Sequence, residues 1–424
     1  MASMEDRVLL GLNYARELYA EKGVDVDQAM ERCGQVAISM HCWQGDDIMG
    51  CEAVGAGASG GIQTTGNYPG RARGGDELRA DLDLALALIP GRKKLNLHGN
   101  YAELKGRKAD RDAYRPEDFA GWIDWAKQAG VGLDLNPTYF SHAKVKDGFT
   151  LASPDKGIRD FWIEHGKRCR EIGQAFAKAL GQPAVLNFWM PDGYKDTPAD
   201  STAPRRRMVE SLDAIFADKS IDTQLVLDSV ESKLFGIGVE RYTVGSHELM
   251  LSYALTRGIM YTLDSGHFHP TEQIADKLSA LLLYLPKLHL HVTRGIRWDS
   301  DHVVALNDDL QYIMDEIVLG NYLDRVLIGL DYFDASINRL AAWVIGMRNT
   351  QKALLRSMLT PHKAILAAEE AGDWTSRFAL QEEAKTLPFT AVWDAYCLKQ
   401  GVPVGDSWLN QVKQYEKDVM FKRG

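Results

Sequence analysis

Long apolar runs, paired cysteines and an excess of positive charge are all missing from this sequence of 424 residues. No stretch of about 18 consecutive apolar residues occurs, so we expect no membrane span. With 49 Lys and Arg against 58 Asp and Glu, the formal net charge is −9. That charge argues against nucleic acid as the main partner, because binding phosphates needs a positive face.

The cysteines and the first residues bear on the cellular compartment. Only five cysteines are present, and none belongs to a CxxC pair. An odd count without paired spacing favours free thiols in a reducing compartment, and we expect the cytoplasm. The first twenty residues have the pattern of an amphipathic helix with acidic residues, not a basic start before an apolar core, so we expect no secretory signal.

What the chain does contain is a regular alternation of short β-rich runs and longer segments of helical period. About eight such units favour a (β/α)8 TIM barrel, because a parallel sheet that closes buries every strand. A doubly wound open sheet is the alternative. The predicted strands cover residues 35–43, 93–98, 131–137, 184–193, 225–234, 257–267, 287–292 and 325–334.

The pattern changes after residue 340. We expect residues 1–340 to form the catalytic barrel with its N-terminal helix, and residues 341–424 to form a mostly helical extension. In a barrel enzyme such an extension packs on the barrel or on a neighbouring subunit, which favours a homo-oligomer.

One motif is misleading. The segment GAGASG at residues 55–60 matches the G-x-G-x-x-G dinucleotide fingerprint. That fingerprint works only where a strand turns directly into a helix whose N-terminus holds the pyrophosphate. Here the predicted strand ends well before the motif and no helix start follows it, so a loop over a cleft is the better interpretation.

The ends of the later strands carry the informative side chains, because barrel enzymes place their chemistry at the carboxyl ends of the strands. Carboxylates that gather there need cations to offset their repulsion. Oxygen and imidazole ligands without a thiolate favour Mn²⁺, Mg²⁺ or Co²⁺. Seven ligands favour two metals that share a bridging carboxylate. The candidate ligands are Glu231, Asp264, His267, His291, Asp299, Asp301 and Asp331.

Several of these positions also have simpler explanations. Asp264 alone is as often a helix cap as a ligand. His289 and His291 share one strand face, and only His291 is near enough to the strand end, so we expect His289 in the core or behind the ligands. Lys233 shares a face with Glu231, and a buried lysine needs a partner such as a substrate oxygen. Trp189 fits a core aromatic and a sugar-stacking ring equally well.

Motifs along the chain resemble the L-rhamnose isomerases, ketol isomerases of the xylose isomerase-like barrel group. They are SMHCWQGDD, GGIQTTGNYPG, LNLHGNY, NFWMPDG, VESKLFGIG, LDSGHFHPTE, RWDSDHV and GLDYFDASINR. The resemblance runs from about residue 5 to the C-terminus. It implies a TIM barrel, a homotetramer, dependence on Mn²⁺ with Mg²⁺ or Co²⁺ as substitutes, and interconversion of L-rhamnose and L-rhamnulose in the cytoplasm.

The resemblance also implies roles for single residues. It assigns a structural metal to Glu231, Asp264, His291 and Asp331. It assigns a catalytic metal to His267, Asp299 and Asp301, with Asp264 available as a bridge. It implies that Lys233, His98 and Trp189 contact the sugar. It also implies that Ile48, Ile62 and Tyr101 form an apolar wall around the sugar's methyl group. Ala58 replaces a larger aliphatic found in some members, which implies a roomier pocket.

An aldose becomes a ketose when hydrogen moves from C2 to C1 and a proton moves from O2 to O1. Two metals favour a hydride shift, because Lewis acids polarise the sugar oxygens. The competing enediol route needs a side-chain base between the two carbons. Ring opening must precede this transfer, and Asp331 is one candidate for the acid or base that it needs. Two alternative functions fit the same residues: a two-metal barrel hydrolase, or an isomerase or epimerase that acts on another sugar.

Overall fold

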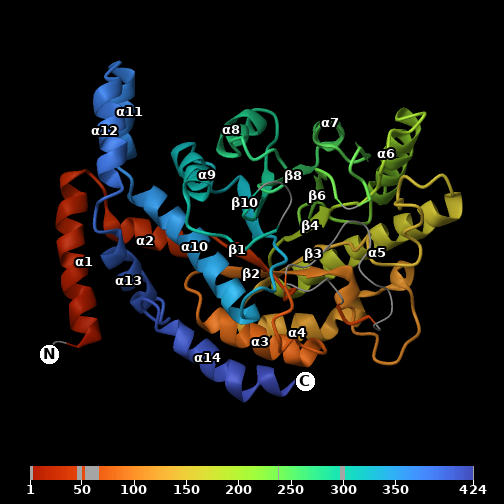
Figure 1. The fold of residues 1–424 in the computed structure, drawn as a ribbon, viewed down its shortest axis with the longest axis horizontal. Coiled ribbons are helices and arrows are strands. Elements are labelled where there is room, and N and C mark those ends of the chain that lie inside the picture. The colour runs from red at the N-terminus through yellow and green to blue at the C-terminus, as the bar shows by residue number, and fades with distance from the viewer. Residues whose placement is uncertain (1–2, 45–49, 53–65, 237, 297–300, 424) are drawn as a thin grey trace.

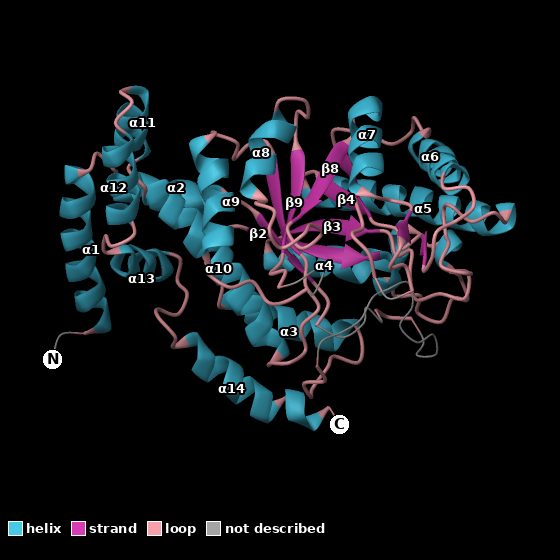
Figure 2. Cartoon of the chain, turned by 45° about the horizontal axis from the view of Figure 1, so that its top comes forward, coloured by secondary structure: helices cyan, strands magenta, loops and turns pink. Residues whose placement is uncertain are grey.

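A closed barrel of eight parallel strands forms the centre of the molecule (Figure 2). The computed structural model describes residues 3–44, 50–52, 66–236, 238–296 and 301–423. Strand β1 pairs with both β2 and β10, so the sheet closes; the predicted TIM barrel is confirmed and the open sheet is excluded. In chain order the barrel strands are β1 Ile38–His41, β2 Lys93–His98, β3 Gly132–Asn136, β4 Ala184–Phe188, β6 Val226–Glu231, β8 Met260–Asp264, β9 Leu288–Val292 and β10 Val326–Leu330.

Eight helices alternate with these strands and surround the barrel (Figure 1). Helix α5 illustrates the local signals that form them. The Asp155 side chain accepts from the Gly157 and Ile158 amides at its start, and Gly181 ends it with a φ of 67°. The barrel helices are α3 Gly75–Ala87, α4 Ala120–Ala129, α5 Lys156–Leu180, α6 Thr202–Phe216, α7 His247–Arg257, α8 Ala275–Leu282, α9 Asp308–Leu319 and α10 Arg339–Leu359.

Each predicted strand contains one barrel strand, but four predictions, those for β4, β6, β8 and β10, run three to five residues past the observed ends. Strand β4 ends at Phe188, and β8 ends at Asp264, although apolar or mixed residues continue the pattern. Most residues from 189 to 192 are buried without ladder hydrogen bonds, so burial produced the pattern there. The short antiparallel pair β5 Gly193–Tyr194 and β7 Tyr242–Thr243 was not predicted, because two residues give no periodicity.

The remaining helices lie together beside and below the barrel (Figure 1). They are α1 Met4–Glu21, α2 Val26–Gln35, α11 His362–Glu370, α12 Trp374–Ala384, α13 Phe389–Lys399 and α14 Trp408–Asp418. The expected division at residue 340 falls in the first turn of α10, which packs against α9 and α2. Near the C-terminus, Arg423 forms a two-pronged ion pair with Asp81 of α3, at 2.6 and 2.7 Å. Within the described ranges, no helix combines the length and apolar character needed to cross a membrane.

Candidate metal centre

Four side chains that lie far apart in the sequence meet at the carboxyl end of the barrel. Glu231 and Asp264 are the last residues of β6 and β8, His291 lies near the end of β9, and Asp331 directly follows β10. These four strands are consecutive neighbours in the closed sheet. One ligand atom from each residue lies within 4.8 Å of the others. The cluster is the same set that the resemblance to the L-rhamnose isomerases assigns to a structural metal.

The imidazole of His291 lies among the three carboxylates. Its Nδ1 is 3.2 Å from Asp331 Oδ2, 3.3 Å from Glu231 Oε1 and 3.7 Å from Asp264 Oδ2. The Glu231, Asp264 and His291 side chains are each about 1% exposed, whereas the Asp331 side chain is 16% exposed. The site therefore faces away from bulk water, with Asp331 nearest to the opening.

Burial and mutual charge shift the protonation of the cluster. Burial alone would lower the pKa of His291, but the neighbouring Glu231 and Asp331 carboxylates outweigh it and raise that pKa well above its usual value. Burial raises the pKa of Asp264 to about 8; the His267 imidazole opposes this shift and the Glu231 carboxylate adds to it. Without a cation, protons compensate for the crowded negative charge.

The donor set fits a divalent cation. Three carboxylates and one imidazole, with no thiolate, match the ligands that Mn²⁺ and Mg²⁺ accept. Among the described residues, His291 Nε2 and Asp331 Oδ1 are buried without a hydrogen-bond partner. Buried polar atoms are normally paired, so such atoms beside a carboxylate cluster need an explanation such as an ion.

The second predicted set of ligands is only partly described. His267 lies at the cluster, with its Nδ1 3.4 Å from Glu231 Oε1. The carbonyl of Asp301 accepts from the Phe333 amide at 3.0 Å, which places its backbone beside the end of β10. Asp301 has a φ of 45°, an uncommon left-handed conformation of the kind that clusters at functional sites. Asp299 lies outside the described residues.

The predicted sugar contacts lie at the same end of the barrel. Lys233 is 3% exposed, and its Nζ lies 4.6 Å from the centre of the Trp189 ring. His98 ends β2, where its Nδ1 is 3.2 Å from Thr138 Oγ1 and its Nε2 is 3.4 Å from Asn136 Nδ2. Burial, together with the positive charge of Arg111, lowers the pKa of His98 well below its usual value. His98 is therefore a neutral imidazole.

The predicted apolar wall is described at one position only. Tyr101 is 6% exposed and its ring lies 6.2 Å from that of Trp122, edge to face. Ile48 and Ile62 lie outside the described residues, as do Ala58 and the whole GAGASG segment. The role of these residues stays a prediction.

Sequence reasoning missed Asn187 of β4, whose Nδ2 donates to Glu231 Oε2. Asn187 is 1% exposed and precedes Trp189 by two residues. Side chains two apart on a strand share a face, so a polar residue inside this apolar run was the available signal. Its partner could not be read from the sequence, because β4 and β6 are joined only through the folded sheet.

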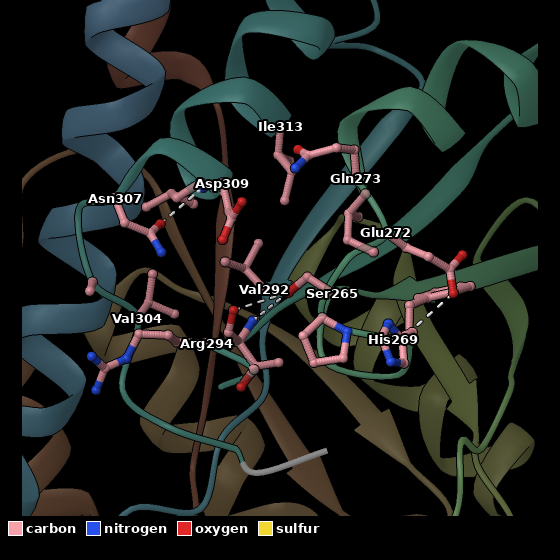
Figure 3. Close-up of a pocket in the computed structure, with 17 residues that line it drawn as sticks. Ser265, His269, Glu272, Gln273, Val292, Arg294, Val304, Asn307, Asp309 and Ile313 are labelled. Carbon is pink, nitrogen blue, oxygen red and sulfur yellow. Dashed lines mark hydrogen bonds between the residues drawn. The ribbon is translucent and has the colours of Figure 1, made fainter. Parts of the chain in front are cut away.

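A separate small cavity lies between the loops that follow β8 and β9 (Figure 3). Ser265, His269, Arg294 and Asn307 are among its lining residues. Its volume of about 60 Å³ has room for only a few waters, so it cannot hold a six-carbon sugar. None of the four cluster residues lines it.

A closed (β/α)8 barrel with nitrogen and oxygen ligands gathered at its carboxyl end defines the class: a TIM barrel with a candidate divalent-metal centre. The chain matches the family model described as L-rhamnose isomerase (RhaA) over residues 8–423. It therefore belongs to the L-rhamnose isomerase family.

Relatives named L-rhamnose isomerase agree with this membership. The chain is 56% identical to the one from Rhodopirellula baltica, over 96% of this chain and 95% of that protein. It is 58% identical to the one from Mannheimia succiniciproducens, over 96% and 97% of the two chains. Among solved structures, D-psicose 3-epimerase from Clostridium cellulolyticum is similar over 76% of this chain and 97% of that one, at 14% identity and a TM-score of 0.47.

The protonation of the cluster predicts that cation binding depends on pH. Below about pH 8 the metal-free protein holds a proton on Asp264, and a cation must displace it. Affinity for Mn²⁺ should therefore rise with pH, by up to about tenfold per pH unit for each proton released, and the raised pKa of His291 adds a second proton that the cation must displace. Calorimetric titration in two buffers of different ionisation enthalpy measures the affinity for Mn²⁺ and the number of protons released on binding. Equal affinity at about pH 6.5 and about pH 8.5, with no proton release, would contradict the assignment.

Proposed function

We propose that this protein is a divalent-metal-dependent aldose–ketose isomerase that interconverts L-rhamnose and L-rhamnulose. The observation that carries the proposal is the buried cluster of Glu231, Asp264, His291 and Asp331 in a chain of the L-rhamnose isomerase family. An aldose–ketose isomerisation is redox-neutral within one molecule. It needs stabilisation of charge on two sugar oxygens and no organic cofactor.

Two cations, with Mn²⁺ as the natural metal, fit this proposal. Glu231, Asp264, His291 and Asp331 would hold one of them. His267, Asp299 and Asp301 would hold the other, with Asp264 as the shared ligand; the position of His267 beside Glu231 supports this second set. When bound, the cations supply Lewis acidity that stabilises negative charge on the sugar oxygens.

Lys233 would act on the sugar directly. Its ammonium lies over the Trp189 ring, and a cation over an aromatic face is held in place by the ring's electrostatic potential. A fixed ammonium in a buried site can donate to the sugar oxygen on which negative charge develops. Trp189 would then position the lysine and offer its remaining ring surface to the sugar's C–H groups.

His98 would orient a sugar hydroxyl as a neutral imidazole. Its Nδ1 lies 3.2 Å from Thr138 Oγ1, and its Nε2 lies 3.4 Å from Asn136 Nδ2, so both ring nitrogens have partners that orient the ring. To accept from a sugar hydroxyl, Nε2 would exchange its long contact with Asn136 for the hydroxyl. Asp331, the most exposed member of the cluster, is the candidate to accept a proton during ring opening.

Removing the metal should abolish ketose formation from L-rhamnose, and Mn²⁺ should restore it. The Asp331→Asn variant, which keeps the shape but loses the charge, should lower kcat/KM by more than about 100-fold, or about 2.7 kcal/mol. Asp334→Asn is the matched control. Its Oδ1 accepts from the Ser336 amide, and an asparagine retains that acceptor. Ketose formation that survives EDTA, or hydrolysis of a phosphoester or amide instead, would refute the function. A panel with L-mannose and L-lyxose measures how strictly the sugar is chosen.

The hydrogen transfer itself can be followed in deuterated water. A hydride shift moves the C2 hydrogen directly to C1, so the product should carry almost no solvent deuterium at C1. An enediol route passes the proton through a side-chain base that exchanges with solvent. Mass spectrometry or NMR of the product distinguishes the two routes, and extensive deuterium at C1 would rule out the hydride shift.

We propose a homotetramer in the cytoplasm, with the helical extension at a subunit contact. Helix α12 buries none of its residues, and Trp374 and Phe378 are 61% and 60% exposed. Leu10 on the nearby α1 is 73% exposed. Trp374 and Phe378 are four residues apart and so share one face of α12, and a contiguous exposed apolar face is typical of an interface. The five cysteines are all free thiols, which fits a reducing compartment.

Changing Trp374 and Phe378 together to serine should lower the mass measured by light scattering below that of the tetramer, because the apolar contact is lost. Leu255→Ser is the control, since it removes an exposed apolar side chain from α7, outside the helical extension. An unchanged mass in the double variant would show that α12 is not part of the interface.

A further inference from the structure

Below the candidate ligands, the barrel interior is filled by polar side chains. Asn187 on β4, Ser229 on β6, Thr262 on β8 and His289 on β9 are each at most 4% exposed. TIM-barrel interiors are usually filled by branched apolar residues, so this polar layer needs a complete set of hydrogen bonds.

The hydrogen bonds of this layer have only one consistent direction. The Glu231 carboxylate can only accept, so Asn187 presents its Nδ2 to Oε2 and turns its Oδ1 the other way. Thr262 Oγ1 lies 2.7 Å from that Oδ1 and must donate its single proton to it. The two lone pairs of the Thr262 hydroxyl then accept from Ser229 Oγ at 2.6 Å and from His289 Nδ1 at 3.1 Å. All three contacts of the hydroxyl are satisfied.

This chain of bonds reaches the cation position through Glu231. Oε2 is held by Asn187, while Oε1 faces His291 Nδ1 at 3.3 Å and His267 Nδ1 at 3.4 Å. If the amide of Asn187 turned over, its oxygen would face the carboxylate and repel it. The orientation of Asn187 therefore decides whether Oε1 is presented to a cation.

Gly329 on β10 leaves the space that His289 occupies. A Cβ at this position would lie 3.2 Å from His289 Nε2 and 3.4 Å from His291 Cδ2. The glycine thus lets one histidine stand behind the other, with ring centres 4.5 Å apart. His289 can then reach Thr262 without displacing His291.

We propose that Thr262 is a positioning residue for the metal centre: its hydroxyl sets the orientation of the Asn187 amide, which fixes Glu231 for cation binding. The inference rests on the proposed function in one respect, namely that the cluster binds a divalent cation. Partners behind metal ligands typically contribute about 10- to 100-fold in metal affinity.

The test is the affinity of the full-length protein for Mn²⁺ alone, measured by calorimetry on metal-free protein. Thr262→Val replaces the hydroxyl by a methyl group of similar size and should weaken binding about 10- to 100-fold. Thr262→Ser keeps the hydroxyl and should stay within about threefold of the original protein. The matched control is Thr350→Val, since Thr350 is equally buried and donates only to the Gly346 carbonyl within α10.

The outcomes separate the two proposals. If the unaltered protein does not bind Mn²⁺, the metal-dependent function fails. If it binds, and the Thr262→Val variant binds with the same affinity, Thr262 does not position the centre. A lower melting temperature of the metal-free variant with unchanged Mn²⁺ affinity would indicate a merely structural role and would also overturn the inference. Should Thr262→Val not fold, Thr262→Ala removes the same hydroxyl with a smaller side chain and should also weaken binding about 10- to 100-fold; unchanged affinity there overturns the inference as well.

Discussion

The structure depends on the repulsion among three carboxylates, two buried and one partly buried, that surround a single imidazole. Glu231, Asp264 and Asp331 lie around His291 Nδ1 at distances of 3.3, 3.7 and 3.2 Å. Charges this close, with little water to screen them, cannot all stay ionised without compensation. Protons provide it in the metal-free chain, as the raised pKa values of His291 and Asp264 indicate. A divalent cation would compensate the same negative charge in place of the protons. The need for this compensation links the fold to the proposed chemistry.

The barrel is what forces these groups together. Neighbouring parallel strands present the residues at their carboxyl ends to one opening, so four strands bring four polar side chains to one point. The same closure buries the layer beneath, where Asn187, Thr262 and His289 must satisfy each other. Polar groups in such a place stabilise a single arrangement when every bond is made, and they destabilise the fold when one is missing. The polar layer inside this barrel thus stabilises one geometry of the candidate metal centre, which an apolar layer in the same place would not do.

The helical extension also supports the opening of the barrel. Asp81 on α3 is fully buried and accepts from Arg423, from Tyr415 Oη at 2.8 Å and from Gln44 Nε2. Gln44 lies three residues after the end of β1. One carboxylate therefore connects the last residues of the chain to the end of a barrel strand, although more than 300 residues separate Arg423 from Asp81 in the sequence. The extension and the barrel depend on each other through this contact.

The sequence by itself determined the eight strand–helix units and four of the candidate metal ligands. Strand alternation reports burial, and residues such as Glu231 and His291 are poor helix caps, so their positions at strand ends pointed to a shared site before any contact was known. Motif resemblance, more than periodicity, separated the L-rhamnose isomerases from other metal-binding barrels. Tertiary structure alone decided which side chains touch: that Asn187 holds Glu231, that Thr262 orients Asn187, and that Arg423 reaches Asp81. A hydrogen bond between strands depends on sheet register and direction, and these arise only when distant segments pair; no local pattern in the chain encodes them.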